Sequence, residues 1–147
     1  MAKLSIELPN SFTFKTEIPV LIQHVNRADH LANEHLVAML NEARTRFSAS
    51  LDWSQSVTQR ENFINADLAV IYKAEAHYGD ELIIEVAAAD FSRFGCDYLY
   101  RVSKKADGCL VAIAKTAMLH FNYQLKRLEP VSPCFATLFK PQDEGFD

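Results

Sequence analysis

The side chains that could do chemistry gather in one short segment early in the chain. His24, His30 and His35 carry imidazole groups and Glu34 carries a carboxylate, and side chains of both kinds can act as general acids or bases. Asn26 lies in the same segment, but an amide has no accessible pKa and cannot be a general base. The segment therefore predicts a site for acid–base or hydrogen-bonding chemistry.

The expected backbone decides which of these groups can share a site. His24 and Asn26 are two positions apart on a segment predicted to be extended, so their side chains should lie on one face. Glu34 and His35 are neighbours on a predicted helix and point in different directions, so at most one can enter a given pocket. Solvated surface is the expected place for both helix residues, and a structural role is expected for His24.

Three residues have a functional and a structural interpretation that the sequence leaves open. Asn33 either faces a substrate or caps a helix, a role that contributes ~1 kcal/mol. His30 can hydrogen-bond a substrate or orient Asn26, or it can make an ordinary structural hydrogen bond. Arg44 can stabilise negative charge or form an ion pair, which contributes little when it is exposed.

A helix that starts at Asn33 must position these groups. Apolar residues recur at steps of four and three, which indicates a helix with one buried face; they are Leu36, Leu40, Ala43, Phe47 and Leu51. Asn33 is the predicted N-cap, and Glu34 follows it at the positive end of the helix dipole. The polar stretch 52–62 is expected to be a loop or a short helix.

Strands are predicted on both sides of this helix. Aromatic and β-branched residues indicate a strand at 11–24, and period-two alternation indicates strands at 63–76, 80–89, 95–103 and 109–123. Short joints that contain glycine predict that consecutive strands pair as antiparallel hairpins. The proline-interrupted tail after Tyr123 should wrap the surface.

These elements predict the fold class and the domain organisation. One helix and several antiparallel strands make an α+β fold, in which a curved antiparallel sheet is wrapped around one long central helix. The length is that of a single domain, residues 1–147. An open sheet edge remains, and pairing two protomers would hide it, so a homodimer is expected.

Composition and charge exclude several function classes. The chain has 15 Lys plus Arg against 19 Asp plus Glu, a net charge of -4, and no basic run of the kind that binds nucleic acid. Its longest uninterrupted apolar run, 109–114, is too short for a membrane span, and its start has no signal-peptide pattern, so a cytoplasmic location is expected. Cys96, Cys109 and Cys134 form no CxxC pattern, so neither disulfides nor a metal site is predicted.

The segment with the candidate residues resembles a signature of a known enzyme family. Residues 24–47 read HVNRADHLANEHLVAMLNEARTRF, similar to the first signature of hot-dog-fold acyl-CoA thioesterases of the 4-hydroxybenzoyl-CoA thioesterase type. That signature has an Asp, then Gly-His-Val-Asn-Asn, and a helix with Glu-Ala-Arg. Asp29 stands in the Gly slot, residues 30–33 fill the next four slots, and residues 42–44 are Glu-Ala-Arg. The later segments NADLAVIYKAEAHYGDELIIEV and AIAKTAMLHFN also resemble the family, so the resemblance covers about residues 14–133.

The resemblance implies a hot-dog fold, a homodimer or homotetramer with active sites at the dimer interface, and hydrolysis of an acyl-CoA or acyl-carrier-protein thioester. It implies no metal and no cofactor beyond the coenzyme A of the substrate. Backbone N–H groups near Asn33 would polarise the carbonyl, and an acid would activate water. Asn26 occupies the slot of the family's catalytic Asp, so a factor of about 10²–10⁴ in rate needs another source.

Three interpretations of Asn26 follow. In the favoured one, Asn26 places water or polarises the substrate and Arg44 supplies a fixed charge, as in the similar thioesterases of enediyne polyketide pathways. In the second, an acid or imidazole takes over, and the candidates are Glu34, His35, His30 and His24. In the third, the site only binds acyl groups. A hydratase or dehydratase of the same fold is a further alternative.

The resemblance also implies a binding role for one turn. The turn 92–95 lies where proteins of this fold place residues near the phosphates or the pantetheine arm of CoA. Arg93, with Ser92 beside it, is therefore the candidate for binding phosphate, and a solvated turn is the alternative. Trp53 and the loop that follows are candidates for covering the acyl pocket.

Overall fold

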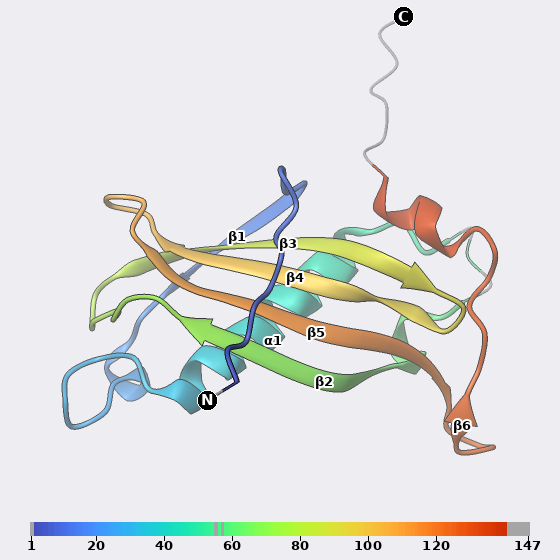
Figure 1. Ribbon diagram of the computed structural model, residues 1–147, viewed down its shortest axis with the longest axis horizontal. Coiled ribbons are helices and arrows are strands. Elements are labelled where there is room, and N and C mark those ends of the chain that lie inside the picture. The colour runs from blue at the N-terminus through green and yellow to red at the C-terminus, as the bar shows by residue number, and fades with distance from the viewer. Residues whose placement is uncertain (1, 55, 57, 141–147) are drawn as a thin grey trace, which may run out of the picture.

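The computed structural model describes residues 2–54, 56 and 58–140 and contains a long helix and an antiparallel sheet (Figure 1). The strands are β1 (Phe14–Pro19), β2 (Phe63–Tyr72), β3 (Glu81–Ser92), β4 (Gly95–Lys104), β5 (Leu110–Asn122) and β6 (Arg127–Leu128). The helix α1 spans Asn33–Ser50. Short 3-10 helices lie in the connections: η1 (Ile22–His24), η2 (Arg60–Asn62) and η3 (Phe135–Phe139).

The sheet has one apolar face that carries the core. Its strand order is β1-β3-β4-β5-β2, with β6 added to β5, and every pairing is antiparallel. Val86 lies opposite Tyr100, and Tyr100 lies opposite Ala114, so these buried side chains form a row across three strands. Side chains alternate between the faces of a strand, as the period-two pattern predicted. The helix α1 lies against the sheet, which curves around it, and the N-terminal residues cross the other face (Figure 1).

A buried stripe holds α1 in the curve of the sheet. Its residues are Leu36, Met39, Leu40, Ala43 and Phe47, which confirms the predicted helix and its apolar face. The Phe47 ring lies 5.0 Å from the Tyr98 ring and 5.3 Å from the Phe14 ring, centroid to centroid. Burial of one such side chain contributes ~1.5–3 kcal/mol. Within the described residues, no helix has the length and apolarity that crossing a membrane requires.

The start of α1 differs from the prediction that Asn33 is its N-cap. The cap residue is Ala32, whose backbone is extended, and no side chain caps the helix. Leu31 donates its N–H to the Ala76 carbonyl at 2.8 Å, and Ala32 donates its N–H to the His24 carbonyl at 3.0 Å. Tertiary hydrogen bonds of buried residues therefore decide where the helix begins, and Asn33 is its exposed first residue.

Two strand predictions are wrong. The strand predicted at 11–24 covers only Phe14–Pro19, because proline cannot donate to a ladder and the chain then turns into η1. The hairpin predicted between the second and third strands does not form, because β2 pairs with β5 while β3 pairs with β1. The chain leaves the sheet after Tyr72, where Lys73 and Ala74 both donate an N–H to the Val111 carbonyl. The two later hairpins, β3–β4 and β4–β5, are confirmed.

The tail also does more than wrap the surface. Phe135 in η3 is buried, and its ring stacks on Phe63 with centroids 5.3 Å apart. Phe91, near the end of β3, lies 6.1 Å from the Phe135 ring. The tail therefore closes the end of the core where β2 begins and β3 ends.

Candidate active site

The loop between η1 and α1 is a tight turn. Asn26 donates its N–H to the His30 carbonyl, and Asp29 donates its N–H to the Asn26 carbonyl, both at 3.1 Å. Asp29 has a φ of 63°, in the left-handed region that glycine adopts most easily, which fits its place in the Gly slot of the signature. The Asn26 Oδ1 accepts the N–H of Ala28 at 3.0 Å. Asn26 therefore holds the turn through its carbonyl oxygen and has its amide NH₂ group left for other contacts.

This turn brings His30 to a carboxylate that the sequence did not indicate. His30 and His77 form an isolated antiparallel bridge. Glu75 contacts both imidazoles, with an oxygen 4.0 Å from His30 Nε2 and the other 3.7 Å from His77 Nε2. The His30 side chain is 31% exposed and that of Glu75 is 66% exposed, so the pair is partly solvated. A carboxylate near an imidazole stabilises the imidazolium that forms when the ring accepts a proton, which suits His30 to general-base catalysis.

Asp80 holds the segment that carries this pair. Its Oδ2 accepts the backbone N–H of His77 at 2.8 Å and lies 3.4 Å from Lys104 Nζ on β4. The hydrogen bond from His77, followed by the charge of Lys104, lowers the pKa of the Asp80 carboxyl even though burial acts in the opposite direction. Asp80 therefore stays ionised at neutral pH and ties the turn to the sheet.

A cavity of about 270 Å³ opens beside His30 at the start of α1. It is lined by His30, Leu31, Asn33, Leu36, Tyr72, Lys73, Ala74, Glu75, Ala76 and Val111. Neither Asn33 nor Glu34 donates its backbone N–H to another described residue, whereas His35 and Leu36 both donate to the Ala32 carbonyl. Free N–H groups in the first turn of a helix are donors for an anion or an oxyanion. The cavity is thus lined by the His30 imidazole, the Glu75 carboxylate and Asn33, the first residue of α1.

His24 and His35 belong to the structure around this site. The His24 Nδ1 accepts the N–H of Leu21 at 2.9 Å, and the two imidazole rings lie 5.4 Å apart. Burial, and to a smaller extent the charge of His35, lowers the pKa of His24, so it acts as a neutral acceptor. His24 ends η1, so the extended segment that would place it in phase with Asn26 does not exist. Glu34 is exposed as predicted, and His35 is only half-exposed.

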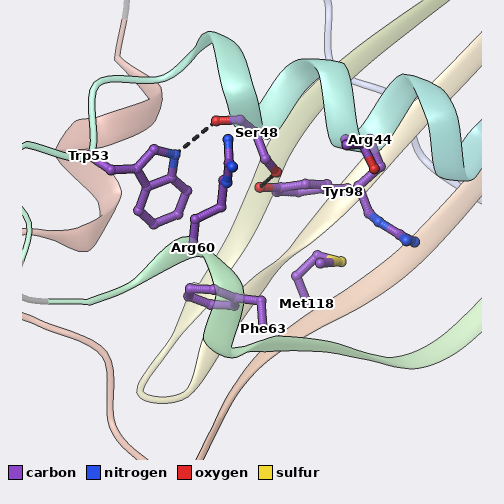
Figure 2. Close-up of a pocket in the computed structure, with 8 residues that line it drawn as sticks. Arg44, Ser48, Trp53, Arg60, Phe63, Tyr98 and Met118 are labelled. Atoms are coloured by element: carbon purple, nitrogen blue, oxygen red, sulfur yellow. Dashed lines mark hydrogen bonds between the residues drawn. The ribbon is translucent and has the colours of Figure 1, made fainter.

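Arg44 lies away from these groups within one chain. It is ~16 Å beyond Asn33 along the axis of α1, and it lines a second cavity of about 170 Å³ (Figure 2). The other lining residues are Thr45, Ser48, Trp53, Arg60, Phe63, Tyr98 and Met118. Ser48 Oγ is 3.2 Å from the Tyr98 hydroxyl, and Trp53 donates its indole N–H to the Ser48 carbonyl at 2.8 Å. Figure 2 shows Trp53 and Arg60 towards one end of this cavity and Arg44 towards the other.

The turn predicted to bind phosphate is exposed and lies at the far end of the sheet. Ser92 Oγ accepts the N–H of Phe94 at 3.4 Å, and the Arg93 guanidinium lies 5.4 Å from the centroid of the Phe94 ring. The strand β3 runs ~35–40 Å from the Asp80 turn to this one. Within one chain, Ser92 and Arg93 are therefore remote from the His30 cavity.

Two features of these cavities were missed by sequence reasoning. Glu75 lies in a stretch with strand character, and Tyr98 has the alternation of a sheet residue, so both were interpreted as strand positions. The spacing of Glu75, two residues before His77 and next to a Gly-containing turn, is a local signal for a position outside the ladder. No local signal pairs Tyr98 with Ser48, because their contact joins β4 to α1.

Comparisons with known proteins agree with this fold. Residues 20–139 match the model of the thioesterase-like superfamily. A 1,4-dihydroxy-2-naphthoyl-CoA thioesterase from Synechocystis has a TM-score of 0.74 at 18% identity, covering 90% of this chain and 98% of that one. A thioesterase from Thermus thermophilus complexed with coenzyme A and Zn has a TM-score of 0.76 at 17% identity, covering 89% of this chain and 100% of that one.

A third solved structure is a mutant 4-hydroxybenzoyl-CoA thioesterase complexed with 4-hydroxybenzoyl-CoA. Its TM-score is 0.74 at 18% identity, covering 86% of this chain and 98% of that one. Comparison of the sequence with curated proteins finds no match. The structural matches confirm the hot-dog fold that the sequence predicts.

Proposed function

Because the chain belongs to the thioesterase-like superfamily, we propose that it hydrolyses the thioester bond of an acyl-CoA or acyl-carrier-protein substrate. The observation that carries this proposal is the cavity at the start of α1, which is lined by His30, Glu75 and Asn33, the first residue of the helix. It favours the interpretation in which an imidazole takes over from the absent Asp. The proposal places the protein in the cytoplasm and needs no cofactor other than the coenzyme A of the substrate.

The proposed reaction uses His30 as the general base. In this scheme Nε2, which lies 4.0 Å from Glu75, carries the ring proton, and Nδ1 is the proton acceptor. Water gives a proton to His30 as its oxygen bonds to the thioester carbonyl carbon, and the N–H groups of Asn33 and Glu34 stabilise the oxyanion. The carbon–sulfur bond then breaks and the thiolate takes the proton from His30. The products are a carboxylic acid and a free thiol.

Asn26 is a positioning residue in this scheme. Its Oδ1 holds the N–H of Ala28, which fixes the turn that presents His30. Asn26 is exposed and does not line the His30 cavity; in this proposal a bound substrate reaches its NH₂ group, which hydrogen-bonds the attacking water or the thioester oxygen. Asn26 then keeps the role predicted from the sequence, which is to place water or polarise the substrate, and its amide does not need to accept a proton.

A homodimer formed through β2 is part of the proposal. The edge strand β2 has ten residues, and Leu68 and Tyr72 on it are 46% and 50% exposed. The opposite edge, β1, has six residues and carries Lys15 and Pro19, which discourage pairing. Antiparallel pairing of two β2 strands would continue the sheet across both copies and hide the unprotected edge.

Such a dimer would join the two cavities. A two-fold axis at the middle of β2 sets the start of one strand beside the end of the other. Phe63 at the start lines the Arg44 cavity, and Tyr72 at the end lines the His30 cavity. Each His30 cavity would then face the Arg44 cavity of the other copy, so an acyl group held at His30 would extend towards the partner's Arg44.

The same symmetry would bring the turn at Ser92 and Arg93 towards the thioester site. Ring contacts from Phe91 to Phe135 and from Phe135 to Phe63 show that this turn lies at the same end as the start of β2. Across the dimer, that end adjoins the His30 cavity of the other copy. In this proposal Arg93 binds the phosphates of coenzyme A.

The test is release of free thiol from a panel of short, long and aromatic acyl-CoA thioesters, with binding of the same compounds measured in parallel. Turnover above ~0.1 s⁻¹, which is modest for an enzyme, supports hydrolysis. Tight binding without turnover contradicts it and favours an acyl-binding protein. With neither turnover nor binding, the same assay is repeated with acyl-carrier-protein thioesters.

A hydratase or dehydratase is the second candidate, and the His30–Glu75 pair is the observation that favours it. Such an enzyme needs an imidazole and an acid converging on the acyl chain, and both line the same cavity. Incubation with an enoyl-CoA separates the two functions. Hydration removes the double bond and leaves the thioester intact, whereas hydrolysis releases thiol.

A further inference from the structure

The lining of the cavity beside Arg44 is positively charged, whereas the chain as a whole is negatively charged. Its lining contains two guanidinium groups, from Arg44 and Arg60, and no carboxylate, although the net charge of the chain is -4. Arg60 is partly neutralised by Glu61 at 3.9 Å, on the exposed side. Arg44 is half-buried and has no carboxylate within 4.0 Å among the described residues.

The neighbours of Arg44 cannot supply the missing negative charge. Burial raises the pKa of Tyr98, and it raises the pKa of Tyr100 to about 12, although hydrogen bonds and the charge of Arg44 act in the opposite direction. Both phenols are therefore neutral at physiological pH. The Tyr98 hydroxyl lies 3.2 Å from Ser48 Oγ and points to the end of the cavity where Arg60 lies, away from the Arg44 guanidinium (Figure 2).

Trp53, Phe63 and Met118 form the apolar part of the cavity wall, and Thr45, Ser48 and Tyr98 add hydroxyl groups. Trp53 is held by its indole N–H bond to the Ser48 carbonyl at 2.8 Å, and its ring lies 6.0 Å from the ring of Phe63. Met118 adds a flexible apolar wall from β5. The volume of about 170 Å³ is close to the ~150 Å³ of a cavity that can hold benzene. The space therefore fits a short apolar body that ends in an anionic group.

We propose that this cavity binds a carboxylate at the far end of the acyl group, so that the preferred substrates are CoA thioesters of short dicarboxylic acids. The carboxylate pairs with Arg44, a charge-assisted contact that a guanidinium makes in bidentate geometry. The methylene chain runs from Arg44 past the Tyr98 and Ser48 hydroxyls and packs between Trp53 and Phe63. The substrate preference rests on the proposed hydrolase function, but the carboxylate site itself does not.

The carboxylate site is tested first by direct binding. Trp53 is the single tryptophan of the chain and lines this cavity, so its fluorescence reports binding there; because Trp53 also lines a neighbouring cavity without Arg44, the Arg44 variant assigns the signal. The probes are valerate and valeramide, which have the same size and differ in charge. Valerate should change the emission saturably and bind at least tenfold more tightly than valeramide, and Arg44→Gln should abolish the difference. Equal binding of the two probes, or no response to valerate, overturns the proposal.

A matched control lies two residues further along the same helix. Arg46 is exposed and is held by Glu42 at 2.9 Å and by the Thr16 hydroxyl at 2.7 Å, outside the cavity. Arg46→Gln should therefore keep the preference for valerate. If Arg46→Gln loses it as fully as Arg44→Gln does, the effect is one of general charge and the assignment to Arg44 is wrong. Circular dichroism of both variants checks that the fold is intact.

The substrate preference is tested by comparing glutaryl-CoA with valeryl-CoA, which have equal chain lengths. The ratio of their kcat/KM values should be at least ten in the wild type, equivalent to about 1.4 kcal/mol, and should fall at least tenfold in Arg44→Gln. Equal kcat/KM values in the wild type overturn the preference. If valerate binds through Arg44 while neither thioester is hydrolysed, the proposed hydrolase function fails and the carboxylate site stands.

Discussion

Replacing His30 by Ala should remove the proton acceptor of the proposed hydrolase. A positioned general base contributes a factor of about 10²–10⁴, so kcat/KM should fall at least ~100-fold. The fold should survive, because the His30 ring is partly exposed and its contact to Glu75 is a loose one of 4.0 Å. Thermal denaturation of the variant checks that the loss is chemical and does not arise from unfolding.

Replacing Glu75 by Gln should slow the reaction less than replacing His30 does, and the distance and exposure of Glu75 set the expected size of this effect. Two unit charges at the 4.0 Å of this pair attract by ~1 kcal/mol in water and by ~4 kcal/mol at an effective dielectric constant of 20. Because Glu75 is 66% exposed, the lower figure applies. Glu75→Gln should therefore slow the reaction about fivefold, since the imidazolium formed in the transition state loses ~1 kcal/mol of stabilisation.

The assay is free-thiol release measured from pH 5 to pH 9 for each variant. His77→Gln is the control, because His77 contacts the same carboxylate at 3.7 Å and is not among the residues that line the cavity. It should keep kcat/KM within about twofold. If His30→Ala keeps more than a tenth of the wild-type kcat/KM, His30 is not the general base. If His77→Gln loses as much as Glu75→Gln, Glu75 acts only by holding the turn.

Three further predictions concern the dimer, the turn and the amide. Leu68→Lys would replace an exposed apolar side chain of the β2 edge by a strongly hydrated charge, which opposes edge-to-edge pairing, so sedimentation should show monomers and thiol release should fall. The contacts of Asp80 lower its folded-state pKa, so its contribution to stability is full above 3.8 and is lost as the pH falls below that value. Asp80→Asn should therefore destabilise the protein by ~1 kcal/mol at pH 7 and by less near pH 3, as urea unfolding can measure. Asn26→Asp keeps the acceptor for the Ala28 N–H and should keep or raise kcat, whereas Asn26→Ala should lower kcat at least tenfold, about 1.4 kcal/mol.

The helix and most strands could be predicted because their signals are local. Leu36, Leu40, Ala43 and Phe47 repeat at the period of a helix, and all four are buried on one side of α1. The alternation of β3 and β4 likewise marks which side chains face the core. Such patterns depend only on the spacing at which side chains return to the same face, so they can be recognised in a single sequence.

Strand partners and the helix cap could not be predicted because distant residues decide them. Period-two alternation shows the face of a strand but not its neighbour, and the Gly-containing joint at Gly79 links β2 to β3 as readily without a hairpin as with one. Asn33 has the chemistry of a cap, yet Ala32 takes that position because Leu31 bonds to Ala76, far along the chain. The need to pair buried backbone groups therefore overrides the local preference of Asn33 for the cap position.

In the candidate site, too, the residues that local signals indicate were predicted and those that distant contacts bring in were not. Asn26, His30 and Asn33 were found because they lie together in one segment, and the structure keeps them around one turn and one helix start. Glu75 joins them only through the bridge between His30 and His77, which no spacing along the chain reveals. Arg44 is separate from these residues, because within one chain it lines a different cavity.

If β2 pairs with a second copy, the same edge strand that forms the dimer also brings the His30 cavity of one copy to the Arg44 cavity of the other. A monomeric variant such as Leu68→Lys should then keep the Arg44-dependent binding of valerate while losing thioester turnover, which separates the binding half of the site from the catalytic half.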